Sequence, residues 1–123
     1  MQIGMIGRGR MGANMVRRLV AAGHECVAHD TQPVAVDAVV ANGARGAATL
    51  DEFVAQLQAP RVVWLMLPAA VVDSAIDALL PLLQPEDIVI DGGNSNFRDD
   101  RRRAAMLASR GLRYVDVGTS GGV

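Results

Sequence analysis

The sequence predicts an α/β fold in which a doubly wound, parallel six-stranded sheet carries helices on both faces. Short apolar runs alternate along the chain with longer stretches of helical spacing, a pattern typical of βαβ units. The runs are continuously apolar, as expected for parallel strands that are buried on both faces. With 123 residues, 50% of them hydrophobic, the chain is long enough for one such core and too short for two full domains.

The apolar runs are the predicted strands. In chain order they are Gln2–Ile6, Glu25–His29, Ala44–Ala47, Val62–Leu67, Asp87–Asp91 and Leu112–Val117. The third run gives the weakest signal. Because parallel neighbours need crossover connections, which are nearly always right-handed, we expect a helix in each gap between strands.

Helical periodicity is visible in these gaps. The apolar stripes are Met11, Met15 and Leu19 in the first gap, and Val72, Ile76, Leu79 and Leu83 in the fourth. Pro33 suits the first turn of a second helix, because its missing N–H group costs nothing there.

Helix ends are marked as well. Thr49 and Glu52 have the spacing of a capping box, which predicts the start of a short third helix. Gly23 and Gly111 stand where the first and last helices are expected to end. The helix-end signals therefore agree with the hydrophobic periodicity.

Composition excludes several classes of function. Twelve basic residues oppose thirteen acidic ones, so the net charge of −1 predicts neither a nucleic-acid nor a membrane partner. All the basic residues are Arg, which excludes a lysine base on this chain. Cys26 is the only cysteine, so we expect no internal disulfide and a reducing, cytoplasmic setting. No signal peptide is evident, and the longest apolar stretch, Val62–Val72, is too short to span a bilayer.

The strongest local motif is Gly7-Arg8-Gly9-Arg10-Met11-Gly12, which follows an apolar strand and opens an amphipathic helix. In that context the pattern G-x-G-x-x-G predicts a dinucleotide site of the Rossmann type. Glycines allow the pyrophosphate to approach the backbone, and the helix N-terminus meets its charge. The alternative is that these glycines serve only tight packing between strand and helix.

An acidic residue is expected about 20 positions after this motif, at the end of the second strand, where it binds the ribose hydroxyls. Asp30 occupies that place. Its carboxylate would repel a 2′-phosphate, and Thr31 and Gln32 supply no guanidinium to hold one, so NAD is favoured over NADP. The alternative is that Asp30 only caps the helix begun by Pro33.

Two polar loops follow the last two predicted strands, at the edge where open α/β sheets bind ligands. Asn94 lies in the first loop, Asp91–Ser95, and offers an amide donor and an acceptor. The second loop, Gly118–Gly122, has successive N–H groups and hydroxyls that could form an anion nest. The alternative is ordinary turn and capping chemistry.

Smaller features are interpreted as structural. His24 and His29 are not expected to bind a metal, because alternating strand residues point to opposite faces. Cys26 is interpreted as a small buried hydrophobe without nucleophilic function. The run Arg101–Arg103 is interpreted as a solvated helix face, with Asp99 and Arg103 as i, i+4 neighbours.

Taken together, these motifs resemble the N-terminal cofactor domain of the decarboxylating 6-phosphogluconate dehydrogenases, over the whole chain. The resemblance rests on Gly7–Gly12 followed by Ala13-Asn14-Met15, on Gly23-His24-Glu25, on Asp87–Ser95 and on Gly118–Val123. The run Gly92-Gly93-Asn94-Ser95 is the specific part, since related β-hydroxyacid dehydrogenases usually have a different loop there. Arg8 departs from the usual apolar residue, and Asp30 replaces the Asn-Arg-Thr pattern of NADP-linked members, which suggests the NAD-linked type.

The resemblance implies a division of labour. Residues 1–123 would form the dinucleotide-binding domain, in which Asn94 contacts substrate and nicotinamide while Ser120, Gly121 and Gly122 line the pocket for 6-phosphogluconate. The family's Lys base and Glu acid lie in a following helical domain, beyond Val123, so no catalytic residue is expected in this chain. The intact protein would oxidise 6-phosphogluconate and decarboxylate it to ribulose 5-phosphate, as a homo-oligomer. Two alternatives remain: a non-catalytic dinucleotide sensor, or another β-hydroxyacid dehydrogenase.

Overall fold

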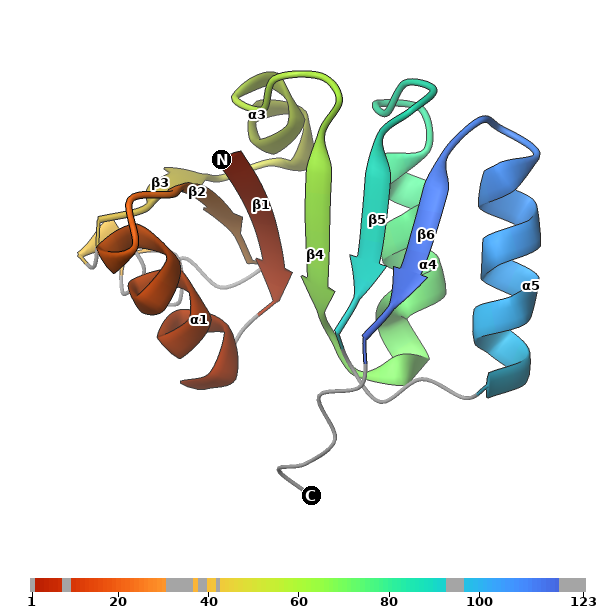
Figure 1. Ribbon diagram of the computed structural model, residues 1–123, viewed down its shortest axis with the longest axis horizontal. Helices are drawn as coiled ribbons and strands as arrows, with labels where there is room; N and C mark the ends of the chain where they lie inside the picture. Colours follow the sequence, from red (N-terminus) through yellow and green to blue (C-terminus); the bar gives the residue numbers. More distant parts are fainter. Residues whose placement is uncertain are drawn as a thin grey trace.

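Six parallel strands form one sheet in a computed structural model of the protein, in the order β3-β2-β1-β4-β5-β6 (Figure 1). The structure describes residues 2–7, 10–30, 37, 40–41, 43–92 and 97–117. The strand order reverses between β1 and β4, which makes the ends of these two neighbours the expected position for a ligand. The predicted doubly wound fold is confirmed.

The strands follow the predicted boundaries to within one residue at each end. The strands are β1 (Gln2–Gly7), β2 (Glu25–His29), β3 (Arg45–Ala47), β4 (Val62–Met66), β5 (Ile88–Asp91) and β6 (Arg113–Asp116). The helices are α1 (Arg10–Ala21), α3 (Leu50–Ala55), α4 (Ala69–Leu79) and α5 (Phe97–Ala108). The predicted start of the second helix at Pro33 lies outside the described residues; further along, Asp37 and Val40 are helical, and the Ala41 N–H donates a hydrogen bond to the Asp37 carbonyl at 3.0 Å.

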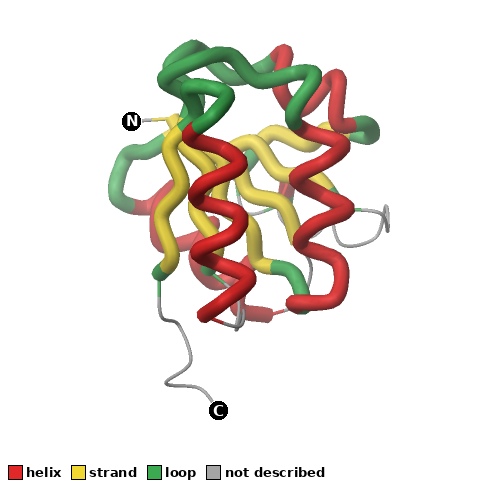
Figure 2. The backbone as a smooth tube through the Cα atoms, turned by 90° about the vertical axis from the view of Figure 1, so that its right-hand side faces the viewer, coloured by secondary structure: helices red, strands yellow, loops and turns green. Residues whose placement is uncertain are grey.

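Helices lie on both faces of the sheet (Figures 1 and 2). On one face, α3, α4 and α5 contribute Phe53, Ile76 and Leu107 to a core cluster that also holds Val63 and Val89 of the central strands. On the other face, α1 places Val16, which is fully buried, over residues of β1 and β2. Cys26 is buried in this second cluster, which confirms its interpretation as an apolar residue.

Local signals account for the helix ends. The hydroxyl oxygen Oγ1 of Thr49 accepts a hydrogen bond from the Glu52 N–H at 3.1 Å, and Oε2 of Glu52 accepts one from the Ala48 N–H at 3.2 Å. The capping interaction is thus confirmed, with its return bond displaced to the residue before the cap. Gly23 and Gly111, with φ of +93° and +77°, lie in the turns that follow α1 and α5, as predicted.

One helix is shorter than its apolar stripe predicted. The stripe placed Leu83 in the same helix as Ile76, but α4 ends at Leu79. Pro81 has no N–H group to continue the helical ladder, and its ring disfavours a further turn. Leu83 still packs against the core from the turn that follows.

A carboxylate fixes the edge of the sheet where the strands begin. Asp87, fully buried before β5, accepts hydrogen bonds from the Arg61 N–H at 2.6 Å and the Gln84 N–H at 2.8 Å. The Arg61 guanidinium pairs with the same carboxylate at 3.2 Å. This cluster holds together the starts of β4 and β5, on the edge opposite the predicted ligand site.

Candidate cofactor site

The carboxyl end of β1 has no room for a side chain. Gly7 has a φ of +134°, and a Cβ atom there would overlap the main-chain carbonyl of Met66 on the neighbouring strand. From this residue the chain enters α1 at Arg10. The first turn of α1 contains Arg10, Met11 and Gly12, so its N–H groups face the same edge of the sheet. Arg8 and Gly9, the remaining motif residues, lie outside the described residues.

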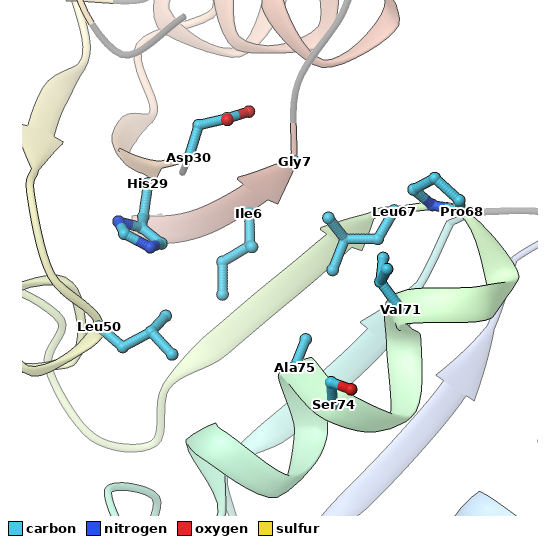
Figure 3. Close-up of a pocket in the computed structure, with 10 residues that line it drawn as sticks. All are labelled: Ile6, Gly7, His29, Asp30, Leu50, Leu67, Pro68, Val71, Ser74 and Ala75. Atoms are coloured by element: carbon cyan, nitrogen blue, oxygen red, sulfur yellow. The ribbon is translucent and has the colours of Figure 1, made fainter. Parts of the chain in front are cut away.

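Asp30 lies beside this turn. It follows β2, whose last residue, His29, is paired with Ile6 of β1, and it is 9% exposed. Figure 3 shows the Asp30 side chain on the same side of a cavity as Gly7. The structure therefore brings together the predicted glycine turn and the predicted carboxylate.

A cavity of about 360 Å³ opens between the ends of β1, β2 and β4. Most of its lining is apolar and comes from β1, α3, α4 and the turn before α4. The lining residues are Ile6, Gly7, His29, Asp30, Leu50, Leu67, Pro68, Val71, Ser74 and Ala75 (Figure 3). Such a cavity fits a flat, uncharged ring, and the Asp30 carboxylate at its edge fits a group that donates hydrogen bonds.

His29 is a residue of this site that the sequence analysis considered only as a metal ligand. Its Nδ1 atom lies 2.9 Å from the carbonyl oxygen of Ala47, and its ring centroid lies 6.3 Å from that of Phe53. Its place at the end of β2, directly before Asp30, was the signal that could have identified it. Among the described residues, no group of three or more His, Cys, Asp or Glu side chains could hold a metal ion.

The end of β5 is the second part of the predicted site. Asp91 is fully buried, and its Oδ2 atom accepts a hydrogen bond from the Tyr114 hydroxyl at 3.1 Å. A Cβ atom at Gly92 would lie 2.8 Å from Met66 Sδ and would overlap the Trp64 indole. The chain that leaves β5 is therefore held closely against β4.

The two loops predicted to carry substrate contacts leave the sheet at adjacent points. Asp91 of β5 is paired in register with Asp116 of β6, so the chain segments after these strands begin side by side. Asn94, Ser120, Gly121 and Gly122 themselves lie outside the described residues. Their roles remain predictions.

The predicted solvated arginine face is wrong at one position. Arg103 is 1% exposed, and its Nε atom donates a hydrogen bond to Oδ1 of Asp73 at 2.8 Å, while its Nη1 lies 3.7 Å from Oδ2 of Asp91. Charge pairing with carboxylates on α4 and β5 is what allows its burial. Arg103, then Arg102, lower the pKa of Asp73 from 3.8 to about 2 by hydrogen bonding to its carboxylate.

Two further findings concern the reactivity of Cys26 and the length of the described helices. Burial raises the pKa of the Cys26 thiol, which makes this residue a poor nucleophile at neutral pH. None of the helices described is sufficiently long and apolar to cross a membrane.

Comparison with known proteins gives a consistent set of similarities. The family described as the NAD binding domain of 6-phosphogluconate dehydrogenase matches residues 2–123. An NAD(+)-dependent, decarboxylating 6-phosphogluconate dehydrogenase of Haloferax volcanii is 45% identical over 123 residues, which cover 99% of this chain and 40% of that protein. The chain therefore spans about two fifths of the length of that relative.

Solved structures share the fold over nearly the whole chain. The 3-hydroxyisobutyrate dehydrogenase of Mycobacterium tuberculosis, solved with L-serine, has a TM-score of 0.88 and 33% identity, covering 98% of this chain and 40% of its own. The 6-phosphogluconate dehydrogenase of Plasmodium falciparum, solved with NADP+ and with 6-phosphogluconate, has a TM-score of 0.85 and 25% identity. It covers 93% of this chain and 26% of its own.

Proposed function

Because the chain belongs to the family of the NAD-binding domain of 6-phosphogluconate dehydrogenase, we propose that it binds NAD within an enzyme that oxidises and decarboxylates 6-phosphogluconate. The observation that carries the proposal is the junction of three features at one edge of the sheet. These are the glycine turn at Gly7, the Asp30 carboxylate and the apolar cavity between β2 and α4.

Each feature fits one part of a dinucleotide. The turn at Gly7 and the N–H groups that begin α1 would take the pyrophosphate, with Arg8, Gly9, Arg10, Met11 and Gly12 as its neighbours in sequence. Asp30 would accept hydrogen bonds from the adenine ribose, and the cavity would hold the adenine ring. When bound, NAD supplies the acceptor for the hydride that leaves the substrate.

The same carboxylate supports a preference for NAD over NADP. A 2′-phosphate next to Asp30 would place two anions together, and Thr31 and Gln32 offer no cation to offset them. The name of the Haloferax volcanii relative carries NAD(+), in agreement with this preference. NADP is the cofactor in the Plasmodium falciparum structure, so the preference is a property to be measured for this chain.

The remaining chemistry is assigned to residues outside the described part of the chain. Asn94 would contact substrate and nicotinamide, and Ser120, Gly121 and Gly122 would bind the sugar acid. Oxidation at C3 would need an acceptor for the hydride, which bound NAD would supply, and a base for the hydroxyl proton; the resulting 3-keto acid would then lose carbon dioxide and be reprotonated. No residue of this chain is Lys, so a lysine base would come from a helical region after Val123. We place the intact protein in the cytoplasm, as a homo-oligomer.

A second candidate is oxidation of a smaller β-hydroxyacid. It is favoured by the 33% identity to the Mycobacterium tuberculosis 3-hydroxyisobutyrate dehydrogenase. The sequence Gly92-Gly93-Asn94-Ser95 supports the sugar-acid substrate instead.

The test is turnover by the full-length protein. With saturating NAD, we expect 6-phosphogluconate to produce NADH and carbon dioxide in equal amounts, while 3-hydroxyisobutyrate produces neither. NADH formation only with 3-hydroxyisobutyrate would establish the second candidate. Absence of any dinucleotide binding in a calorimetric titration would overturn both.

A further inference from the structure

His29 presents one bonded and one free ring nitrogen at the candidate cofactor cavity. A carbonyl oxygen can only accept a hydrogen bond, so Nδ1, 2.9 Å from the Ala47 oxygen, must carry the proton of the neutral ring. Nε2 is then left with a lone pair. Within the described part of the chain, Nε2 makes no hydrogen bond, and it is not shut off from the surface.

The lone pair belongs to a ring whose orientation is fixed. The Ala47 bond holds one side of the imidazole against β3, and the Phe53 ring packs at a tilt of 53° beside it. Figure 3 shows the imidazole between Asp30 and Leu50, among the side chains that line the cavity. His29 is therefore a hydrogen-bond acceptor with a defined direction at an otherwise mostly apolar wall.

The polar lining of the cavity is sparse. Among the lining side chains that belong to the described residues, only His29, Asp30 and Ser74 carry a polar group. Asp30 lines the same cavity as His29, so a sugar held by its carboxylate would place the attached base against the apolar wall formed by Leu50, Val71 and Ala75. Nε2 of His29, the hydrogen-bond acceptor on the cavity wall, would then face the edge of that base.

We infer that His29 is a specificity-determining residue, whose Nε2 accepts a hydrogen bond from the exocyclic amino group of the adenine ring. This inference rests on the proposed function. The amino group is the hydrogen-bond donor on the edge of adenine, while hypoxanthine and guanine carry a carbonyl oxygen at the same position. An oxygen facing the Nε2 lone pair would leave two acceptors opposed, so the cavity selects adenine.

The test compares two dinucleotides that differ only at this position of the purine. The full-length protein is titrated with NAD and with nicotinamide hypoxanthine dinucleotide, and the two values of Kd are compared. We expect NAD to bind about tenfold or more tightly, because a bound hypoxanthine ring would cover Nε2 and leave this polar atom without a partner. Equal affinity of the unaltered protein for both would overturn the inference and leave the proposed function standing.

Two substitutions separate the roles of the ring nitrogens. His29→Asn keeps an amide near Ala47 in place of Nδ1 but removes Nε2, so we expect the ratio of the two Kd values to fall to about one. His29→Gln places near the position of Nε2 an amide that can turn to present either its oxygen or its N–H groups, so we expect it to bind both dinucleotides and to keep the ratio near one. If His29→Asn weakens binding of both dinucleotides equally, the side chain acts on the sugar or on pocket shape, and the inference is wrong.

His24→Asn is the matched control, since His24 is the other histidine of the chain and does not line the cavity. It should leave the ratio unchanged. Circular dichroism checks that each variant folds, and the ratio measured on the unaltered protein decides the question if one does not. Failure of the protein to bind either dinucleotide would instead overturn the proposed function and this inference with it.

Discussion

Arg103 and Asp73 join two helices on the same face of the sheet. The Arg103 guanidinium on α5 is 1% exposed and donates a hydrogen bond from Nε to Oδ1 of Asp73 on α4 at 2.8 Å. Asp73 lies one residue from Ser74, which lines the cavity, while the same guanidinium approaches Asp91 at the end of β5. A single cation thus ties α4 to the strand from which the Asn94 loop departs.

Replacing this cation should destabilise the protein strongly. Arg103→Met removes the buried guanidinium that bonds to Asp73 and lies 3.7 Å from the buried Asp91 carboxylate, and removal of one partner from a buried pair typically costs about 3–5 kcal/mol. Urea unfolding followed by circular dichroism measures the loss. Arg102→Met is the control, because that guanidinium is 54% exposed and also bonds to Asp73; it should cost less than about 1 kcal/mol. Equal losses in the two variants would contradict the account.

Low pH should weaken the contact of Asp73 with Arg103 and Arg102. Hydrogen bonds from Arg103 and Arg102 lower the pKa of Asp73 from 3.8 to about 2 in the folded protein. A carboxyl group with a depressed folded pKa stabilises the fold above its unfolded pKa and loses that contribution as pH falls through the folded value. The contribution should therefore be complete above pH 4 and disappear towards pH 2.

The measurement is the free energy of unfolding at several pH values, for the unaltered protein and for Asp73→Asn. We expect the difference between the two proteins to shrink as pH falls over this range. Because Asp73 is 45% exposed, solvent screening keeps the effect small. A difference that stays constant down to pH 2 would show that the ion pair contributes nothing.

Cofactor preference should depend on Asp30. Calorimetric titration is expected to show tighter binding of NAD than of NADP, owing to repulsion between the carboxylate and the 2′-phosphate. Asp30→Ala removes both the acceptor for the ribose hydroxyls and the repulsion of the 2′-phosphate. The affinity for NAD should therefore fall about tenfold, and the ratio of NAD affinity to NADP affinity should decrease. Unchanged NAD affinity would mean that Asp30 only caps the helix that follows.

Gly7 should tolerate no side chain. Gly7→Ala combines a φ of +134° with overlap against the Met66 carbonyl, and we expect a loss of about 3 kcal/mol or more together with loss of NAD binding. Gly23→Ala is the matched control: φ is +93° there, but a Cβ atom would meet nothing within 4 Å. Its cost should be limited to backbone strain, about 1–2 kcal/mol, with NAD affinity retained.

The fold could be predicted from the sequence because its signals are local. Continuous apolar runs located each described strand to within one residue at either end, and helical stripes located α1 and α4, although the stripe of α4 extended four residues beyond the end of that helix. The spacing of Thr49 and Glu52 indicates the start of α3, because the hydrogen bond that caps this helix joins residues three apart. Interactions of this kind can be read from spacing alone.

Contacts between distant residues could not be read in the same way. The burial of Arg103 depends on Asp73, 30 residues away, whereas its local pattern with Asp99 indicated a solvated face. The role inferred for His29 depends likewise on the Ala47 carbonyl, 18 residues away, which directs one ring nitrogen and frees the other. The site at Gly7 and Asp30 was predictable because Gly7 ends β1 and Asp30 directly follows β2, so the predicted strand ends locate both residues.

The carboxylate cluster of Asp87 has a consequence for redesign of this domain. The cluster sits before β5, so the four-residue strand, about 13 Å long, separates it from the edge that carries the cavity. Substitutions at Asp30, Thr31 or Gln32 that aim to exchange one coenzyme for another leave this anchor untouched. The Asp87 cluster and the residues expected to set coenzyme preference therefore lie at opposite ends of the strands, so a change in coenzyme preference need not disturb this part of the fold.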